Sequence, residues 1–174
     1  MALLEIVTTP DPVLRRKARK ITTFDKDLQT LIDNMIETMR AAPGVGLAAP
    51  QVGVSERLIV IEYGEEDDEE GEGEKKPKKL YALVNPEIVA ASEEKVEGVE
   101  ACLSIPRLAG EVDRHDALEI KALNRFGKPV KIKAKGWLAR IFQHEIDHLE
   151  GILFTDRANR VWRPSENEAI ADEV

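Results

Sequence analysis

The chain has 174 residues, of which 43% are hydrophobic and 33% are charged, and its formal net charge is −8 at pH 7. This length and composition are those of an ordinary soluble protein with one hydrophobic core. The negative charge, with no basic stripe, argues against nucleic-acid binding. The single cysteine, Cys102, excludes an internal disulfide framework. With no basic leader and no apolar run long enough to cross a bilayer, we expect a cytoplasmic protein without membrane contact.

The first predicted element is an amphipathic helix over residues 25–41, whose apolar residues recur with the period of a helix that buries one face. Residues 57–63 and 80–84 are short, apolar and rich in β-branched or aromatic side chains, which predicts two strands. Between them, residues 65–79 hold an acidic run followed by lysines. Because this stretch has almost nothing apolar to bury, we expect a flexible, solvated loop.

The second half of the chain predicts a β-hairpin that leads directly into a helix. Residues 117–123 and 129–135 alternate apolar and polar side chains around a turn. A buried helix follows from Trp137 to Leu149. The order of elements favours an α+β fold, with mainly antiparallel β-sheets packed around this central helix. We expect one domain over residues 1–174, with a C-terminal tail at 161–174 that is either helical after Pro164 or frayed.

This second helix carries an H-E-x-x-H motif from His144 to His148. Histidines four residues apart lie on one face of a helix, one turn from each other. Together they can bind one divalent metal, and Glu145 can reach a metal-bound water. Two surface histidines are the alternative for so short a pattern. The apolar neighbours indicate a buried helix, which favours the metal.

A catalytic metal site usually has three protein ligands, and two residues compete for the third position. Cys102 is the only thiol of the chain, although a lone cysteine is more often a small buried hydrophobic residue. Glu168 lies in a segment, 167–172, that resembles the one supplying the third zinc ligand in gluzincin metalloproteases. A helical tail with a solvated face explains Glu168 more simply, since it lies near the end of the chain.

Residues 44–53 form a Gly-rich segment that offers one side-chain amide, Gln51. Glycines permit a close approach of the backbone to a ligand, and an amide can donate a hydrogen bond to a developing oxyanion. A tight connection between a helix and a strand would explain the glycines without any ligand.

Together these segments resemble the peptide deformylase family. Its first motif is matched by residues 44–51 (GVGLAAPQ), its second nearly by 100–104 (EACLS), and its third by 143–149 (QHEIDHL). Residues 9–15 also look like the N-terminal segment of the family. Three motifs in the right order are far more specific than H-E-x-x-H alone.

Two departures from the family pattern stand out. The second motif usually reads E-G-C-L-S, and Ala101 replaces the glycine. A positive φ at this position would cost roughly 1–2 kcal/mol, whereas extended backbone would cost little. The charged loop at 65–79 is also longer than the family requires. A non-enzymatic alternative follows from the first departure: a metal-stabilised peptide-binding module whose activity was lost through Ala101.

The resemblance implies that Cys102, rather than Glu168, completes the metal site with His144 and His148. A thiolate and two neutral imidazoles leave one open position on a divalent metal, which lowers the pKa of a bound water. Family members are typically iron(II) enzymes that also work with nickel, cobalt or, less well, zinc. We therefore expect Fe(2+), although this ligand set suits all four metals.

The implied reaction removes the formyl group from the N-terminal methionine of nascent peptides and releases formate. Glu145 would accept the water proton and later deliver it to the leaving amine. The oxyanion would be held by the metal, the Gln51 side-chain amide and the Leu103 backbone N–H. The implied partners are nascent formyl-methionyl peptides near the ribosome, although no segment identifies a docking surface.

The remaining candidates are expected to surround this centre. Two of them, Trp137 and Ile141, share a helix face with the two histidines, although ordinary core packing explains them equally well. The expected substrate-binding residues, which would enclose the methionine side chain, are Val45, Gly46, Leu47, Trp137 and Ile141. Candidates for supporting the metal ligands from behind are Glu100, Asp147 and Arg114, with surface salt bridges as the alternative.

Overall fold

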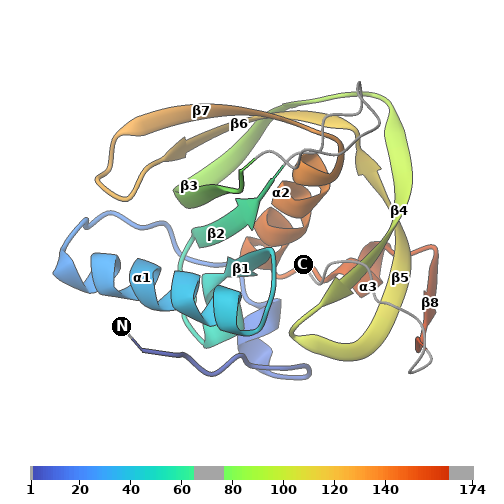
Figure 1. Cartoon of the computed structure of the whole chain (residues 1–174), viewed down its shortest axis with the longest axis horizontal. Coiled ribbons are helices and arrows are strands. Elements are labelled where there is room, and N and C mark those ends of the chain that lie inside the picture. The colour runs from blue at the N-terminus through green and yellow to red at the C-terminus, as the bar shows by residue number, and fades with distance from the viewer. Residues whose placement is uncertain (1, 65–76, 165–174) are drawn as a thin grey trace.

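The structure is a computed structural model that describes residues 2–64 and 77–164. It has an α+β fold in which two antiparallel sheets lie on either side of one long helix, as predicted (Figure 1). The helices are α1 (Lys26–Ala41), α2 (Gly136–Leu149) and the short α3 (Phe154–Arg157), with 3₁₀ turns η1 (Pro12–Arg15) and η2 (Ala49–Val52).

The larger sheet has five strands in the order β1-β2-β3-β6-β7, and the smaller has three in the order β4-β5-β8. The strands of the larger sheet are β1 (Gly46–Ala48), β2 (Leu58–Tyr63), β3 (Lys79–Ala91), β6 (Ala117–Leu123) and β7 (Pro129–Lys135). Those of the smaller sheet are β4 (Lys95–Cys102), β5 (Ile105–His115) and β8 (Arg160–Trp162). Every pairing between these strands is antiparallel.

Strand β2 is buried on both faces because a helix covers each of them. Leu58 and Val60 join the hydrophobic cluster that includes the buried face of α1. Ile59 and Ile61 point to the opposite face, as alternate residues of a strand must, and join the cluster of α2. This explains why the segment reads as a continuous apolar run rather than as an alternating one.

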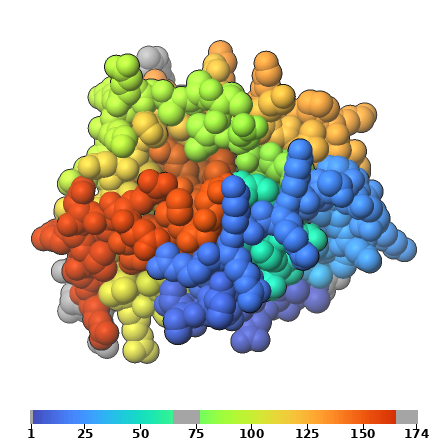
Figure 2. All heavy atoms as spheres, turned by 180° about the vertical axis from the view of Figure 1, so that it is seen from behind, coloured from blue at the N-terminus to red at the C-terminus, as the bar shows by residue number. Residues whose placement is uncertain are grey.

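The N-terminal segment crosses the back of the molecule, where it lies against the C-terminal part of the described chain (Figure 2). Arg15, at the end of η1, forms an ion pair with Asp156 of α3. The backbone N–H of Ala18 donates to the carbonyl of Leu149, the last residue of α2. The hydrogen bond to Leu149 holds the N-terminal segment against the C-terminal end of α2, the helix that carries the histidines.

The two long helices and the hairpin of β6 and β7 confirm the predicted elements. The strand predicted at 80–84 is the beginning of the much longer β3. Of the predicted charged loop, residues 65–76 lie outside the described residues, and Lys79 already belongs to β3. Of the predicted tail, Val161 and Trp162 pair with β5 in strand β8, and 165–174 lie outside the described residues. Among the described residues, no helix is long and apolar enough to span a membrane.

Candidate metal centre

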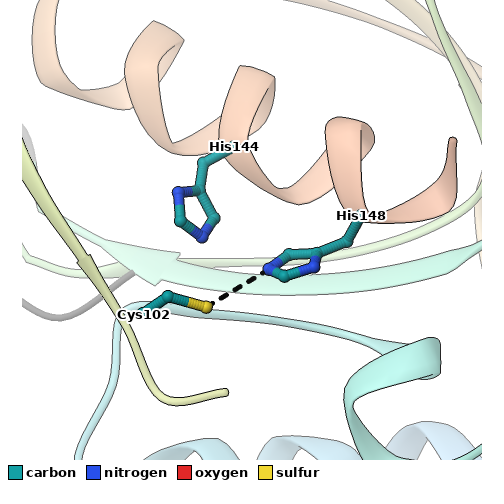
Figure 3. A group of neighbouring side chains, drawn as sticks. All are labelled: Cys102, His144 and His148. Carbon is teal, nitrogen blue, oxygen red and sulfur yellow. Dashed lines mark hydrogen bonds between the residues drawn. The ribbon is translucent and has the colours of Figure 1, made fainter. Parts of the chain in front are cut away.

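Three side chains from two elements converge between the sheets. Cys102 is the last residue of β4, and His144 and His148 lie one turn apart on α2. Figure 3 shows both imidazoles extending from the helix toward the thiol. One ligand atom from each residue lies within 4.8 Å of the other two, and Cys102 Sγ is 3.4 Å from His148 Nε2. All three side chains are at most 2% exposed, so the site is formed inside the protein.

The contacts of His144 leave one of its ring nitrogens available to a metal. His144 Nδ1 lies 2.9 Å from a carboxylate oxygen of Glu100, whereas His144 Nε2 is buried and has no hydrogen-bond partner among the described residues. A buried polar atom without a partner is costly in free energy, and a bound metal removes that cost. One thiolate and two imidazoles are also a donor set that divalent transition metals accept. The residues present therefore fit one such ion.

Burial controls the charge of two of these candidate ligands. It raises the pKa of the Cys102 thiol well above its ordinary value, and the nearby carboxylate of Glu145 adds to the effect. Burial also lowers the pKa of His148 well below its ordinary value, and the charge of His144 acts in the same direction. A neutral His148 is ready to bind a metal, and a coordinating thiol gives up its proton to the solvent when the metal binds.

Glu145 lies next to this cluster and is fully buried. Within the part of the chain that the structure describes, neither of its carboxylate oxygens has a hydrogen-bond partner, and Oε1 is 3.9 Å from His144 Nε2. Burial raises the pKa of Glu145 well above its ordinary value, and the charge of Glu100 raises it further, while Arg114 opposes both. A carboxyl group with a raised pKa beside a metal site can both accept and donate a proton near neutral pH.

A buried ionic network holds His144 from behind. Arg114 donates to both oxygens of Glu100, each at 2.9 Å, and to Asp147 at 2.7 Å. Asp147 also accepts two hydrogen bonds from Arg157. Burial would raise the pKa of Glu100, but the hydrogen bonds from Arg114 and His144 outweigh it and hold the pKa below its ordinary value. Glu100, Arg114 and Asp147, which the sequence suggested as supporting residues, therefore lie in one network behind His144.

Arg140 belongs to the same network, and the sequence alone assigned it no role. It is buried on α2, four residues before His144, and it donates to Glu100 at 2.7 Å. It also donates to the backbone carbonyls of Val112 and Val96. Its position in the sequence could have indicated this role, because a residue four positions before a ligand lies on the same helix face as that ligand.

Gln51 lies at the edge of the cluster, fully buried in η2. Its Oε1 accepts a hydrogen bond from the Ala48 backbone N–H at 2.9 Å, which fixes the direction of the amide group. Its Nε2 is 3.2 Å from Ser104 Oγ and 3.6 Å from Cys102 Sγ. Leu103 follows Cys102 directly, in the turn between β4 and β5. Both predicted oxyanion donors therefore lie beside the same thiol.

The predicted substrate-binding residues separate into two groups. Val45 and Trp137 pack, partly buried, against the hydrophobic cluster that contains Ile141. Leu47 is fully buried in the other cluster, which includes the apolar face of α1. Gly46 has a different neighbour, because a Cβ there would lie 3.0 Å from the Glu145 side chain. Val45, Trp137 and Ile141 thus belong to one hydrophobic cluster and Leu47 to the other.

Ala101 pairs with Ala109 of the antiparallel strand β5, directly before a register shift between Ala101 and Cys102. Among the described residues, the non-glycine positions with positive φ are Asn85 and Arg107. The backbone at Ala101 therefore carries none of the strain that a positive φ would impose.

Comparisons with known proteins agree with this geometry. The family model for polypeptide deformylase matches residues 3–163. A peptide deformylase of Symbiobacterium thermophilum is 54% identical over 174 residues, which are all of this chain and 75% of that protein. The crystal structure of the Thermotoga maritima peptide deformylase aligns with a TM-score of 0.79 and 40% identity, covering 91% of this chain and 99% of that one.

A third similar protein is the class I type b peptide deformylase of Acinetobacter baumannii, whose crystal structure has Met-Ala-Ser bound. It aligns with a TM-score of 0.80 and 35% identity, covering 89% of this chain and 98% of that one. The family match extends over most of the chain and includes the segments that supply Cys102, His144 and His148. On these grounds, the chain belongs to the peptide deformylase family.

Proposed function

We propose that Cys102, His144 and His148 hold the divalent metal with which this enzyme removes the N-terminal formyl group from newly synthesised proteins. The observation that supports this most directly is the convergence of three buried ligand atoms within 4.8 Å of one another. The unpartnered Nε2 of His144 adds to it, because a buried imidazole nitrogen needs a partner. Peptide deformylase activity itself follows from the family match along residues 3–163.

The metal that we propose is iron(II). A thiolate with two imidazoles also suits zinc, nickel and cobalt, so a purified sample can carry any of these metals. A bound divalent metal supplies Lewis-acid activation of water and of the formyl carbonyl group.

The residues around the metal would transfer the proton and stabilise the oxyanion. Glu145 accepts a proton from the attacking water, whose oxygen bonds to the formyl carbon. As the carbon–nitrogen bond breaks, Glu145 returns that proton to the leaving amine, and the products are formate and a free N-terminus. The Gln51 Nε2 and the Leu103 backbone N–H donate hydrogen bonds to the carbonyl oxygen while it gains negative charge.

The partners that we propose are nascent formyl-methionyl peptides in the cytoplasm, met near the ribosome. The Acinetobacter baumannii relative was crystallised with Met-Ala-Ser, a peptide with methionine at its N-terminus. Val45, Trp137 and Ile141 are apolar and pack in one cluster, which suits them to receive a methionine side chain.

The test is formate release from formyl-Met-Ala-Ser under anaerobic conditions, together with the metal content of the protein. We expect one metal per chain, loss of turnover after chelation, and recovery when iron(II) is added back. His148→Ala should lose both metal and turnover. His115→Ala is the matched control, because His115 lies outside the cluster and its Nδ1 contacts the carbonyl of Ser92. Unchanged turnover in the fully chelated protein would overturn the proposal.

A further inference from the structure

Arg140 connects the helix that carries both histidines to two strands of the smaller sheet. Its guanidinium donates to the carboxylate of Glu100 in β4, to the Val96 carbonyl in β4 and to the Val112 carbonyl in β5, at 2.6–2.8 Å. The side chain is only 4% exposed. These bonds lie between α2 and the strand that ends at Cys102, so they bear directly on how His144 sits relative to the thiol.

Arg140 is the second arginine that donates to the carboxylate of Glu100. Arg114 already pairs with both oxygens of this carboxylate, at 2.9 Å each. Arg114 is also shared with Asp147, and the desolvation of these buried charges offsets much of their attraction, so the ion pairs alone are weak evidence for a role in stability. A second donor at Oε2 does, however, restrict the rotation of the carboxylate, whose Oε1 lies 2.9 Å from His144 Nδ1.

The backbone of β4 leaves room for this guanidinium at one position. A Cβ built on Gly98 would lie 2.6 Å from Cζ of Arg140 and 2.7 Å from its Nη2. The Trp137 ring lies 5.5 Å from the same Cζ. The three atoms nearest to that Cβ all belong to Arg140, so a substitution at Gly98 displaces the guanidinium first.

We propose that Arg140 is a positioning residue for the metal centre and acts through Glu100. It holds the carboxylate so that Oε1 meets His144 Nδ1, and this leaves His144 Nε2 directed at Cys102 and His148. The inference rests on the proposed metal site. Such partners behind a metal ligand typically change metal affinity about 10–100-fold when they are removed.

The experiment compares Arg140→Met, Arg140→Lys and Gly98→Ala in the cobalt(II)-loaded protein, with Arg125→Met as the matched control. Arg125 is also an ion-paired arginine, but it pairs with Asp33 of α1, away from the centre. Two quantities are measured well below the melting temperature: the rate of cobalt loss to a chelator, and the visible spectrum of the bound cobalt. The double variant, Arg140→Met with Gly98→Ala, tests whether the two positions act through one contact.

We expect Arg140→Met and Gly98→Ala each to lose cobalt about tenfold faster than wild type and to alter its visible spectrum. Arg140→Lys should recover part of the loss, Arg125→Met should behave as wild type, and the double variant should be no worse than Arg140→Met. If Arg140→Met does not fold, Gly98→Ala decides alone.

A lower melting temperature with wild-type cobalt loss and spectrum in both variants would overturn the inference and leave the metal site intact. A wild-type protein that binds no cobalt through Cys102 would instead overturn the proposed function together with the inference. The two failures are therefore distinguishable.

Discussion

The backbone at Gly46 packs directly against the side chain of Glu145, since a Cβ there would lie 3.0 Å from both Cγ and Cδ of the glutamate. The first strand of the larger sheet therefore confines the carboxyl group beside His144. Burial raises the pKa of Glu145 well above its ordinary value, and the charge of Glu100 raises it further. The relationship links the Gly-rich segment to the H-E-x-x-H helix, two parts of the chain that the sequence could connect only through a family resemblance.

Replacing Glu145 by glutamine should abolish proton transfer while leaving the metal ligands in place. We expect kcat for formyl-Met-Ala-Ser to fall by roughly 10²–10⁴, which is the usual contribution of a general acid–base group, with unchanged metal content. Formate release and metal analysis on the same preparation measure both. Glu119→Gln, an exposed change on β6, is the control. Turnover of Glu145→Gln within a few-fold of wild type would exclude Glu145 as the proton carrier.

Leucine is similar in shape to glutamine but has no amide group. Replacing the buried Gln51 by leucine therefore removes a proposed oxyanion donor. We expect kcat to fall on the order of 10²–10³ with the metal retained. Ser104→Ala is the matched comparison, because it removes the neighbour 3.2 Å from Gln51 Nε2 but keeps the donor. Steady-state kinetics measure kcat of both variants. Equal losses of kcat would mean that Gln51 acts through packing rather than through its amide.

Substitutions at Leu47 and Val45 should affect different properties: Leu47 should matter for stability and Val45 for substrate binding. Leu47 is fully buried in the cluster of α1, so Leu47→Ala should cost about 2–5 kcal/mol of unfolding free energy with little change in KM. Val45→Ala should raise KM for formyl-Met-Ala-Ser at a smaller cost in stability. Urea unfolding and Michaelis kinetics test the pair. A raised KM in Leu47→Ala with wild-type stability would place Leu47 in the methionine pocket after all.

Restoring glycine at position 101 should gain nothing for catalysis. Ala101 lies in an antiparallel pair with no positive φ, so Ala101→Gly should lose about 0.5–1 kcal/mol of stability through added backbone freedom. Turnover should stay within a few-fold of wild type. A rise of a hundredfold, from a nearly inactive wild type, would instead support the peptide-binding module that has lost its activity.

The sequence predicted the two long helices and the β6–β7 hairpin because each has a clear hydrophobic period. It did not predict β1, because this strand has only three residues. It also missed the β4–β5 pair, because the apolar pattern there is interrupted by Gly98, Pro106 and Gly110. The sequence predicts Leu47 at the pocket, because a short Gly-rich segment does not reveal which face of β1 meets α2, and its role in binding substrate stays a prediction. Its placement under α1 depends on the pairing of β1 with β2.

The candidate site was predictable where neighbours in the sequence form it, and less so where distant segments do. H-E-x-x-H places two ligands by helix geometry alone, whereas Cys102 needed the family resemblance. Arg140 could not be assigned, because its partners Val112, Glu100 and Val96 lie 28 to 44 residues away on the strands that the sequence did not predict. The catalytic roles of Glu145 and of the oxyanion donors remain predictions that kinetics must test.

The most direct test of the metal site compares Cys102→Ser with Glu168→Gln. Glu168 lies outside the described part of the chain. Metal content and anaerobic formate release are measured on both variants and on wild type. If Cys102, His144 and His148 hold the metal, Cys102→Ser loses both metal and turnover, and Glu168→Gln keeps both. Loss of the metal in Glu168→Gln, with full metal content and turnover in Cys102→Ser, would contradict the site.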